Sequence, residues 1–272
     1  MHSGMLDHTD NDLEEIVKTA VDLGFTEIAI TEHLIWPLVK NPRQASEDDH
    51  DTLFPNKELI PNDKRKTTDL FDYFNKIDGC QKKYSIKILK GLEVDYFAEF
   101  EDEVKECLAK HEIDIILGSC HYISNAEAHL PIDKRYLKVA RSEDIDLYLK
   151  KYSEENLYSV YFQNILSAIK SKMFDYVAHL DFLKRGFKNY DYSRANNYLT
   201  PVLAELIKND VGLEINVSGL KHVGETYPAR EVINSYIKMG GNKISIGSDA
   251  HSVSRMKKMT PIINDLSKIY PL

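Results

Sequence analysis

Short apolar runs alternate with segments of helical periodicity from Leu13 onward. Nearly continuous apolar strands that alternate with helices are typical of a parallel sheet covered by helices. The chain has six such runs, and the N-terminus could add a truncated seventh strand. This number favours an α/β barrel of the TIM type over an open doubly wound sheet. The rhythm therefore predicts a single domain over residues 1–272. The runs are EIAIT (27–31), IKILKGLEV (86–94), DIILGSCHY (114–122), DYVAHLD (175–181), VGLEINVS (211–218) and KISIGSD (243–249).

Local signals predict where several helices begin and end. Asn11 is expected to cap the helix that starts near Leu13, and Gly24 is expected to end it. Thr200-Pro201 and Thr260-Pro261 are each expected to open a helix, because proline is favoured at the first helical position.

Residues 36–68 break this alternation. The segment carries four prolines and many charges. Long loops within compact domains are commonly functional. The segment is therefore predicted to be a long loop insertion that forms a lid.

Charge and composition exclude several classes of function. The 272-residue chain has 35 basic and 43 acidic residues, a net charge of −8 that repels nucleic-acid phosphates and anionic membrane surfaces. No apolar run has the length of about 18 residues that a membrane span needs. The polar, acidic N-terminus does not resemble a signal peptide, and three cysteines without CxxC spacing indicate reduced thiols. These features predict a cytoplasmic protein.

Histidines and carboxylates stand at the end of strand after strand. The carboxyl ends of parallel strands form one face, so these side chains are expected to converge there. A single histidine of this kind is commonly structural, but the repetition predicts a metal site. Imidazole with carboxylate suits zinc, manganese or iron. The set exceeds the needs of one tetrahedral ion, which predicts two or three divalent ions with Glu93 as the bridge. The residues are His33, Glu93, His121, His179, Asp249 and His251, together with His2 and His8 near an N-terminal strand.

Six motifs in this order resemble the polymerase-and-histidinol-phosphatase (PHP) superfamily, specifically its monofunctional histidinol-phosphatase branch. The resemblance spans His2 to His251. It implies a distorted seven-stranded barrel, a trinuclear metal site and hydrolysis of L-histidinol phosphate, a small phosphate monoester. The motifs are EIAITEH, GLEVD, GSCHYI, VAHLDFLKR, LEINVSGL and GGNKISIGSDAH.

Position by position, the resemblance implies three metal sites. The family motif begins His-x-His-Ser, and His2-Ser3 matches its second half, so its first histidine would fall one residue before Met1. Three alternatives stay open: the sequence starts at an internal methionine, the first site has only three ligands, or a vector-derived histidine ahead of Met1 fills the position. The implied ligands are His2, Glu93 and Asp249 for the first ion, Glu93, His121 and His179 for the second, and His8, His33 and His251 for the third.

Phosphate recognition needs positive charge as well as metal. By resemblance Arg185 is expected to bind the phosphate, and Lys221 and Arg255 are further candidates. Glu93 and Asp249 are the expected catalytic residues, around a water that two close ions activate for in-line attack. The alternatives are a PHP-type phosphoesterase for nucleotides or sugar phosphates, and a degenerate metal-binding module. The sequence makes no prediction about the oligomeric state.

Overall fold

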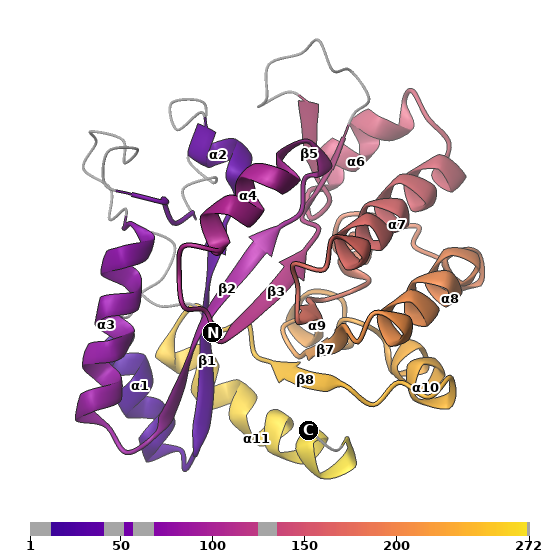
Figure 1. Ribbon diagram of the computed structural model, residues 1–272. Coiled ribbons are helices and arrows are strands. Elements are labelled where there is room, and N and C mark those ends of the chain that lie inside the picture. The colour runs from indigo at the N-terminus through magenta and orange to yellow at the C-terminus, as the bar shows by residue number, and fades with distance from the viewer. Residues whose placement is uncertain (1–11, 41–51, 57–67, 125–134, 271–272) are drawn as a thin grey trace. The chain divides into compact units, whose positions relative to one another are not determined.

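The computed structural model describes residues 12–40, 52–56, 68–124 and 135–270 (Figure 1). His2, His8 and the N-terminal strand position lie outside these ranges, as does most of the predicted insertion at 36–68. Within that insertion Trp36–Lys40 forms helix α2. The predicted domain extent stays a prediction.

Each predicted apolar run contains a strand. In the described part of the chain, six strands form one sheet with the order β1-β2-β3-β6-β7-β8. The pairings β1–β2, β6–β7 and β7–β8 are parallel, as the α/β prediction requires. The strands are β1 Glu27–Leu34, β2 Lys87–Asp95, β3 Ile115–Ser119, β6 Tyr176–Val177, β7 Gly212–Asn216 and β8 Ile244–Gly247.

A second sheet was not predicted. It is an antiparallel pair of three-residue strands, β4 Tyr122–Ser124 and β5 Tyr136–Lys138. Strands this short carry too little alternation of apolar and polar residues for a sequence pattern to reveal them.

Helices connect the strands (Figure 1). Besides α2 they are α1 Leu13–Asp22, α3 Leu70–Lys83, α4 Glu101–Leu108, α6 Ser142–Leu149, α7 Glu154–Ser171, α8 Tyr192–Lys208, α9 Gly219–His222, α10 Arg230–Lys238 and α11 Val253–Ile269, with 3₁₀ helices η3 Ala98–Phe100 and η4 Phe182–Arg185. No described helix is both long and apolar enough to cross a membrane.

Three predicted helix boundaries are wrong. Pro201 lies inside α8 and Pro261 inside α11, so neither opens a helix. α8 buries apolar residues on both sides of Pro201, and α11 buries Val253, Met256 and Met259 ahead of Pro261. This packing outweighs the hydrogen bond that proline cannot donate. The cap of α1 is Asp12 rather than Asn11, because the Asp12 carboxylate accepts a hydrogen bond from the Glu15 amide at 2.9 Å. Gly24 does follow the end of α1 with a positive φ of 81°.

The chain divides into two compact units, each assembled from several chain segments. The first comprises Met1–Val94, Asp102–Leu117 and Ser248–Asp265, and the second Asp95–Glu101, Gly118–Gly247 and Leu266–Leu272.

Each unit has its own core. In the first, the fully buried Tyr73 on α3 places its hydroxyl 2.9 Å from the carbonyl oxygens of Ile30 and Gly91, which ties α3 to β1 and β2. In the second, Tyr198 on α8 stacks on Tyr158 and Phe162 of α7, with ring centroids 6.1 and 6.2 Å apart.

Candidate metal centre

In the first unit, the predicted ligands His33 and Glu93 are direct neighbours. They pair in register near the carboxyl ends of β1 and β2. Their side chains are buried, and His33 Nδ1 lies 4.0 Å from Glu93 Oε2. The two strands therefore bring these two side chains together at their carboxyl ends.

Asp249 and His251 also belong to the first unit. The His251 ring lies 6.5 Å from the His33 ring, measured between centroids. His251 Nδ1 lies 2.9 Å from the Asp249 carbonyl oxygen and 3.6 Å from its carboxylate. A proton on Nδ1 satisfies that carbonyl, and Nε2 is then the nitrogen that would bind a metal ion. Asp249 has a φ of 48°, a left-handed conformation that is uncommon outside glycine and clusters at functional sites.

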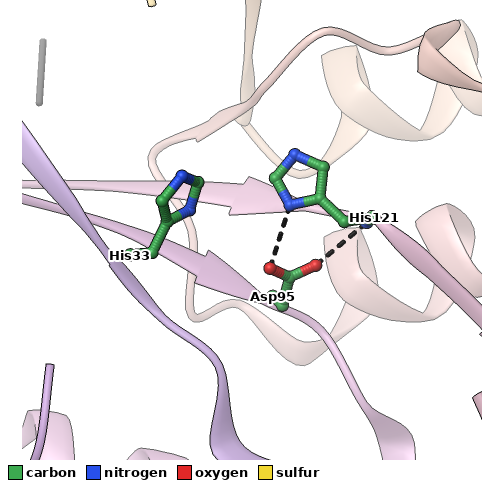
Figure 2. A group of neighbouring side chains, drawn as sticks. All are labelled: His33, Asp95 and His121. Carbon is green, nitrogen blue, oxygen red and sulfur yellow. Dashed lines mark hydrogen bonds and ion pairs between the residues drawn. The ribbon is translucent and has the colours of Figure 1, made fainter. Parts of the chain in front are cut away.

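In the second unit, the predicted ligands His121 and His179 face each other, with their Nε2 atoms 3.1 Å apart. Asp95 holds His121 in this orientation (Figure 2). One Asp95 carboxylate oxygen accepts a hydrogen bond from the His121 amide at 2.9 Å, and the other lies 3.0 Å from His121 Nδ1. A carboxylate on Nδ1 fixes the tautomer and directs the Nε2 lone pair toward the facing ring.

These residues fit divalent metal ions. Zinc–nitrogen bonds of about 2.0–2.1 Å in a tetrahedral site place two ligating nitrogens about 3.3 Å apart. The 3.1 Å between His121 Nε2 and His179 Nε2 is close to that separation. The donors in both units are imidazole nitrogens and carboxylate oxygens, the set that suits zinc, iron and manganese.

Asp95 is not among the ligands predicted from the sequence. Its position two residues after Glu93 in β2 was the available signal, because alternate residues of a strand share a face. Asp95 is 2 % exposed, so its two contacts with His121 form away from solvent.

The Phe182 ring contacts both histidines of the pair and also the Arg185 guanidinium. Its ring centroid lies 4.9 Å from that of His121 and 4.5 Å from that of His179. The Arg185 guanidinium carbon lies 5.4 Å from the same ring, within cation–π range. Arg185 is exposed, so its donors are accessible to a ligand beside the histidine pair.

A buried ion pair anchors the 3₁₀ helix η4, which carries Arg185. Lys184 donates to the Asp181 carboxylate and to Glu225, both at 2.9 Å, and to the Tyr192 hydroxyl at 2.8 Å. Burial raises the pKa of Asp181, and the Lys184 ammonium opposes that shift. The pair therefore holds η4 in place through partners on α8 and in the loop before α10.

Two other predicted phosphate-binding residues are less well placed. Lys221 is exposed on α9 of the second unit, and Arg255 lies half-buried on α11 of the first. Within the described ranges, no hydrogen bond or ion pair joins either side chain to a predicted ligand. The buried Nε atom of Arg255 has no hydrogen-bond partner there.

The cysteines behave as predicted. Cys80, Cys107 and Cys120 are buried thiols. Burial raises the pKa of Cys107 to about 11 and also raises the pKa of Cys120, so both stay protonated at neutral pH. Thiolates are the form that binds metal.

Replacing Asp95 by asparagine should weaken zinc binding by about 10- to 100-fold, the usual effect of removing a carboxylate that orients a ligating histidine. The amide no longer favours the His121 tautomer with its proton on Nδ1. Titration of the metal-free protein against a chromogenic chelator measures the change. Asp146→Asn on α6 removes an exposed carboxylate from the same unit and should leave the affinity unchanged. Equal affinity in both variants would contradict the orienting role of Asp95.

Comparisons with known proteins agree with this chemistry. The PHP domain model matches residues 1–218. The histidinol-phosphatase of Bacillus subtilis is 27 % identical over 265 residues, which cover 92 % of this chain and 91 % of the relative. The histidinol-phosphatase of Lactococcus lactis is 24 % identical over 259 residues, 91 % of this chain and 82 % of the relative.

Solved structures confirm the predicted fold class. A structure from Listeria monocytogenes superposes with a TM-score of 0.73 at 22 % identity, covering 96 % of this chain and 97 % of the other. The Lactococcus lactis histidinol phosphate phosphatase, complexed with zinc, L-histidinol and phosphate, has a TM-score of 0.68 at 19 % identity, covering 97 % and 91 %. With the family match over residues 1–218, these findings establish that the chain belongs to the PHP domain family.

Proposed function

We propose that this protein is a metal-dependent histidinol-phosphatase that hydrolyses L-histidinol phosphate to L-histidinol and phosphate in histidine biosynthesis. The observation that carries the proposal is the pair of facing histidines, His121 and His179, oriented by Asp95 and flanked through Phe182 by Arg185. The named relatives, which align over most of this chain, supply the substrate class.

The proposed metal ligands are the strand-end residues of both units. They would hold two or three divalent ions, as zinc, iron or manganese, and Glu93 would be the carboxylate shared between two of them. His2 and His8 belong to the proposal from the sequence alone. The other ligands are His33, His121, His179, Asp249 and His251.

Four residues of the site, Asp95, Arg185, Phe182 and Asp249, each have a role in this reaction. The bound ions supply charge stabilisation and an activated water. Asp95 holds the proton on His121 Nδ1, which keeps Nε2 available as a ligand. Arg185 holds the phosphoryl oxygens, and the Phe182 ring keeps water from one side of the histidine pair. Asp249 orients the attacking water or relays its proton. A cytoplasmic location accompanies this proposal and is supported by the three buried thiols.

The test combines metal analysis with a substrate panel. The purified protein should carry at least two transition-metal ions per chain and release phosphate from L-histidinol phosphate faster than from nucleotide or sugar monophosphates. Removal of metal by a chelator should abolish the activity, and added zinc, iron or manganese should restore it. If the purified protein binds no metal, the proposed metal centre is wrong. If it binds metal but prefers another phosphate ester, only the proposed substrate is wrong.

A further inference from the structure

Glu214 is a buried carboxylate on β7 that has no part in the proposed chemistry. It is 4 % exposed and lies in the second unit, with His179 and the strands β6 and β8. Its Oε2 accepts a hydrogen bond from the backbone amide of His179 at 2.9 Å and another from the Asn216 side-chain amide at 3.2 Å. A buried charge that contacts the main chain of a predicted ligand suggests a role in positioning that ligand.

The His179 backbone needs such support. Its φ of 30° lies in the left-handed region, where a residue with a side chain is strained. Strain of this kind persists only where the surroundings hold it. Two neighbouring bonds hold the same turn, since the Ala178 amide donates to Gly118 O at 3.0 Å and the Phe182 amide to His179 O at 2.8 Å. The bond to Glu214 is the one that fixes the His179 amide itself.

The neighbouring strand leaves room for this carboxylate. Gly247 on β8 pairs with Asn216 on β7, and a Cβ atom at Gly247 would lie 1.8 Å from Glu214 Oε1. A side chain at that position would therefore displace the carboxylate. Asn216 is fixed in turn, because its Oδ1 accepts a hydrogen bond from the Ser218 amide at 2.9 Å. Glu214 is thus confined by residues from three segments of one unit.

We propose that Glu214 is a positioning residue that holds the His179 backbone so that its Nε2 atom stays directed at His121. The inference rests on the proposed metal centre, because it assigns Glu214 a part in presenting one metal ligand. Glu214 itself is not a metal ligand in the proposed centre. It acts by accepting the hydrogen bond of the His179 amide, and the proton of that amide takes no part in the reaction.

Three variants test this role. Glu214→Ala removes the acceptor, and Glu214→Gln keeps an oxygen of similar position. Leu213→Ala is the matched control, because Leu213 is buried on the opposite face of β7 and its truncation lowers stability without touching His179. Hydrogen exchange of the His179 amide is followed in the metal-free protein, and zinc affinity is measured by competition with a chromogenic chelator.

The Glu214→Ala variant should exchange the His179 amide faster than wild type and bind zinc about 10- to 100-fold more weakly. Glu214→Gln should recover most of both properties, and Leu213→Ala should match wild type in zinc affinity. Wild-type exchange and affinity in Glu214→Ala, or an equal loss of affinity in Leu213→Ala, would overturn the proposal.

A second substitution tests the same contact from the other strand. Gly247→Ala should mimic Glu214→Ala, because the added Cβ displaces the carboxylate, whereas Gly247→Ala added to Glu214→Ala should cost little more. If the losses of zinc affinity in the two single variants simply added up in the double variant, the two residues would not act through the same contact. If wild type itself bound no zinc, the proposed metal centre would fail, while the exchange of the His179 amide would still report whether Glu214 holds this backbone.

Discussion

Replacing Glu93 by glutamine should lower the turnover of L-histidinol phosphate by orders of magnitude. Mutating a residue that only orients a metal ligand costs roughly 10- to 100-fold, and the loss of a bridging ligand should exceed that. Glu93 is 4 % exposed and lies beside His33. A bridging carboxylate neutralises two cations at once, and the amide of glutamine carries no charge to replace it. The repulsion between the ions then rises, so the metal content should fall together with the turnover. Steady-state kinetics and elemental analysis of one preparation measure both quantities.

The matched control for this prediction is Glu106→Gln on α4. Glu106 belongs to the same unit, but its side chain is 75 % exposed and pairs with Lys110. The same loss of charge there should change neither metal content nor turnover, because exposed ion pairs contribute little. A Glu93→Gln protein with full metal occupancy and nearly wild-type turnover would show that Glu93 is not the bridge.

Replacing Arg185 by alanine should cost roughly 2–5 kcal/mol in transition-state binding, by analogy with removing one partner of a buried charge pair. Its guanidinium lies over Phe182, whose ring contacts both His121 and His179. A guanidinium holds two phosphate oxygens at once, which an ammonium does not reproduce, so Arg185→Lys should recover only part of the loss. The loss should appear in kcat/KM while the metal content stays at the wild-type level, since arginine does not ligate cations.

Arg194→Ala is the control for Arg185. Arg194 is half-exposed on α8 of the same unit and forms an ion pair with Glu154. Its removal should leave kcat/KM unchanged and alter stability by about 0.5 kcal/mol or less, as surface substitutions usually do. Unchanged kcat/KM in Arg185→Ala would instead direct attention to Lys221 and to Arg255, whose buried Nε atom lacks a hydrogen-bond partner among the described residues.

Local patterns in the sequence determined the strands and the chemical type of the site. A buried parallel strand must be apolar over several residues, so runs such as EIAIT are visible without a structure. Parallel strands also present their carboxyl ends on one side, which is why the strand-end residues were predicted to converge. His33 and Glu93 are indeed paired in register there. The helix signals failed at Pro201 and Pro261, because a buried apolar face stabilises a helix more than one missing hydrogen bond weakens it.

The tertiary structure alone decided which polar groups meet. Asp95 and His121 are separated by 26 residues, and Glu214 and His179 by 35, so no local periodicity links them. Both contacts depend on strand register and on space, such as the missing side chain at Gly247 that admits the Glu214 carboxylate. A hydrogen bond forms only within a narrow range of distance and angle, whereas sequence periodicity specifies only which face of a strand a residue occupies. The sequence therefore determined which kinds of side chain stand at the strand ends, and packing between distant segments decided which residues contact them.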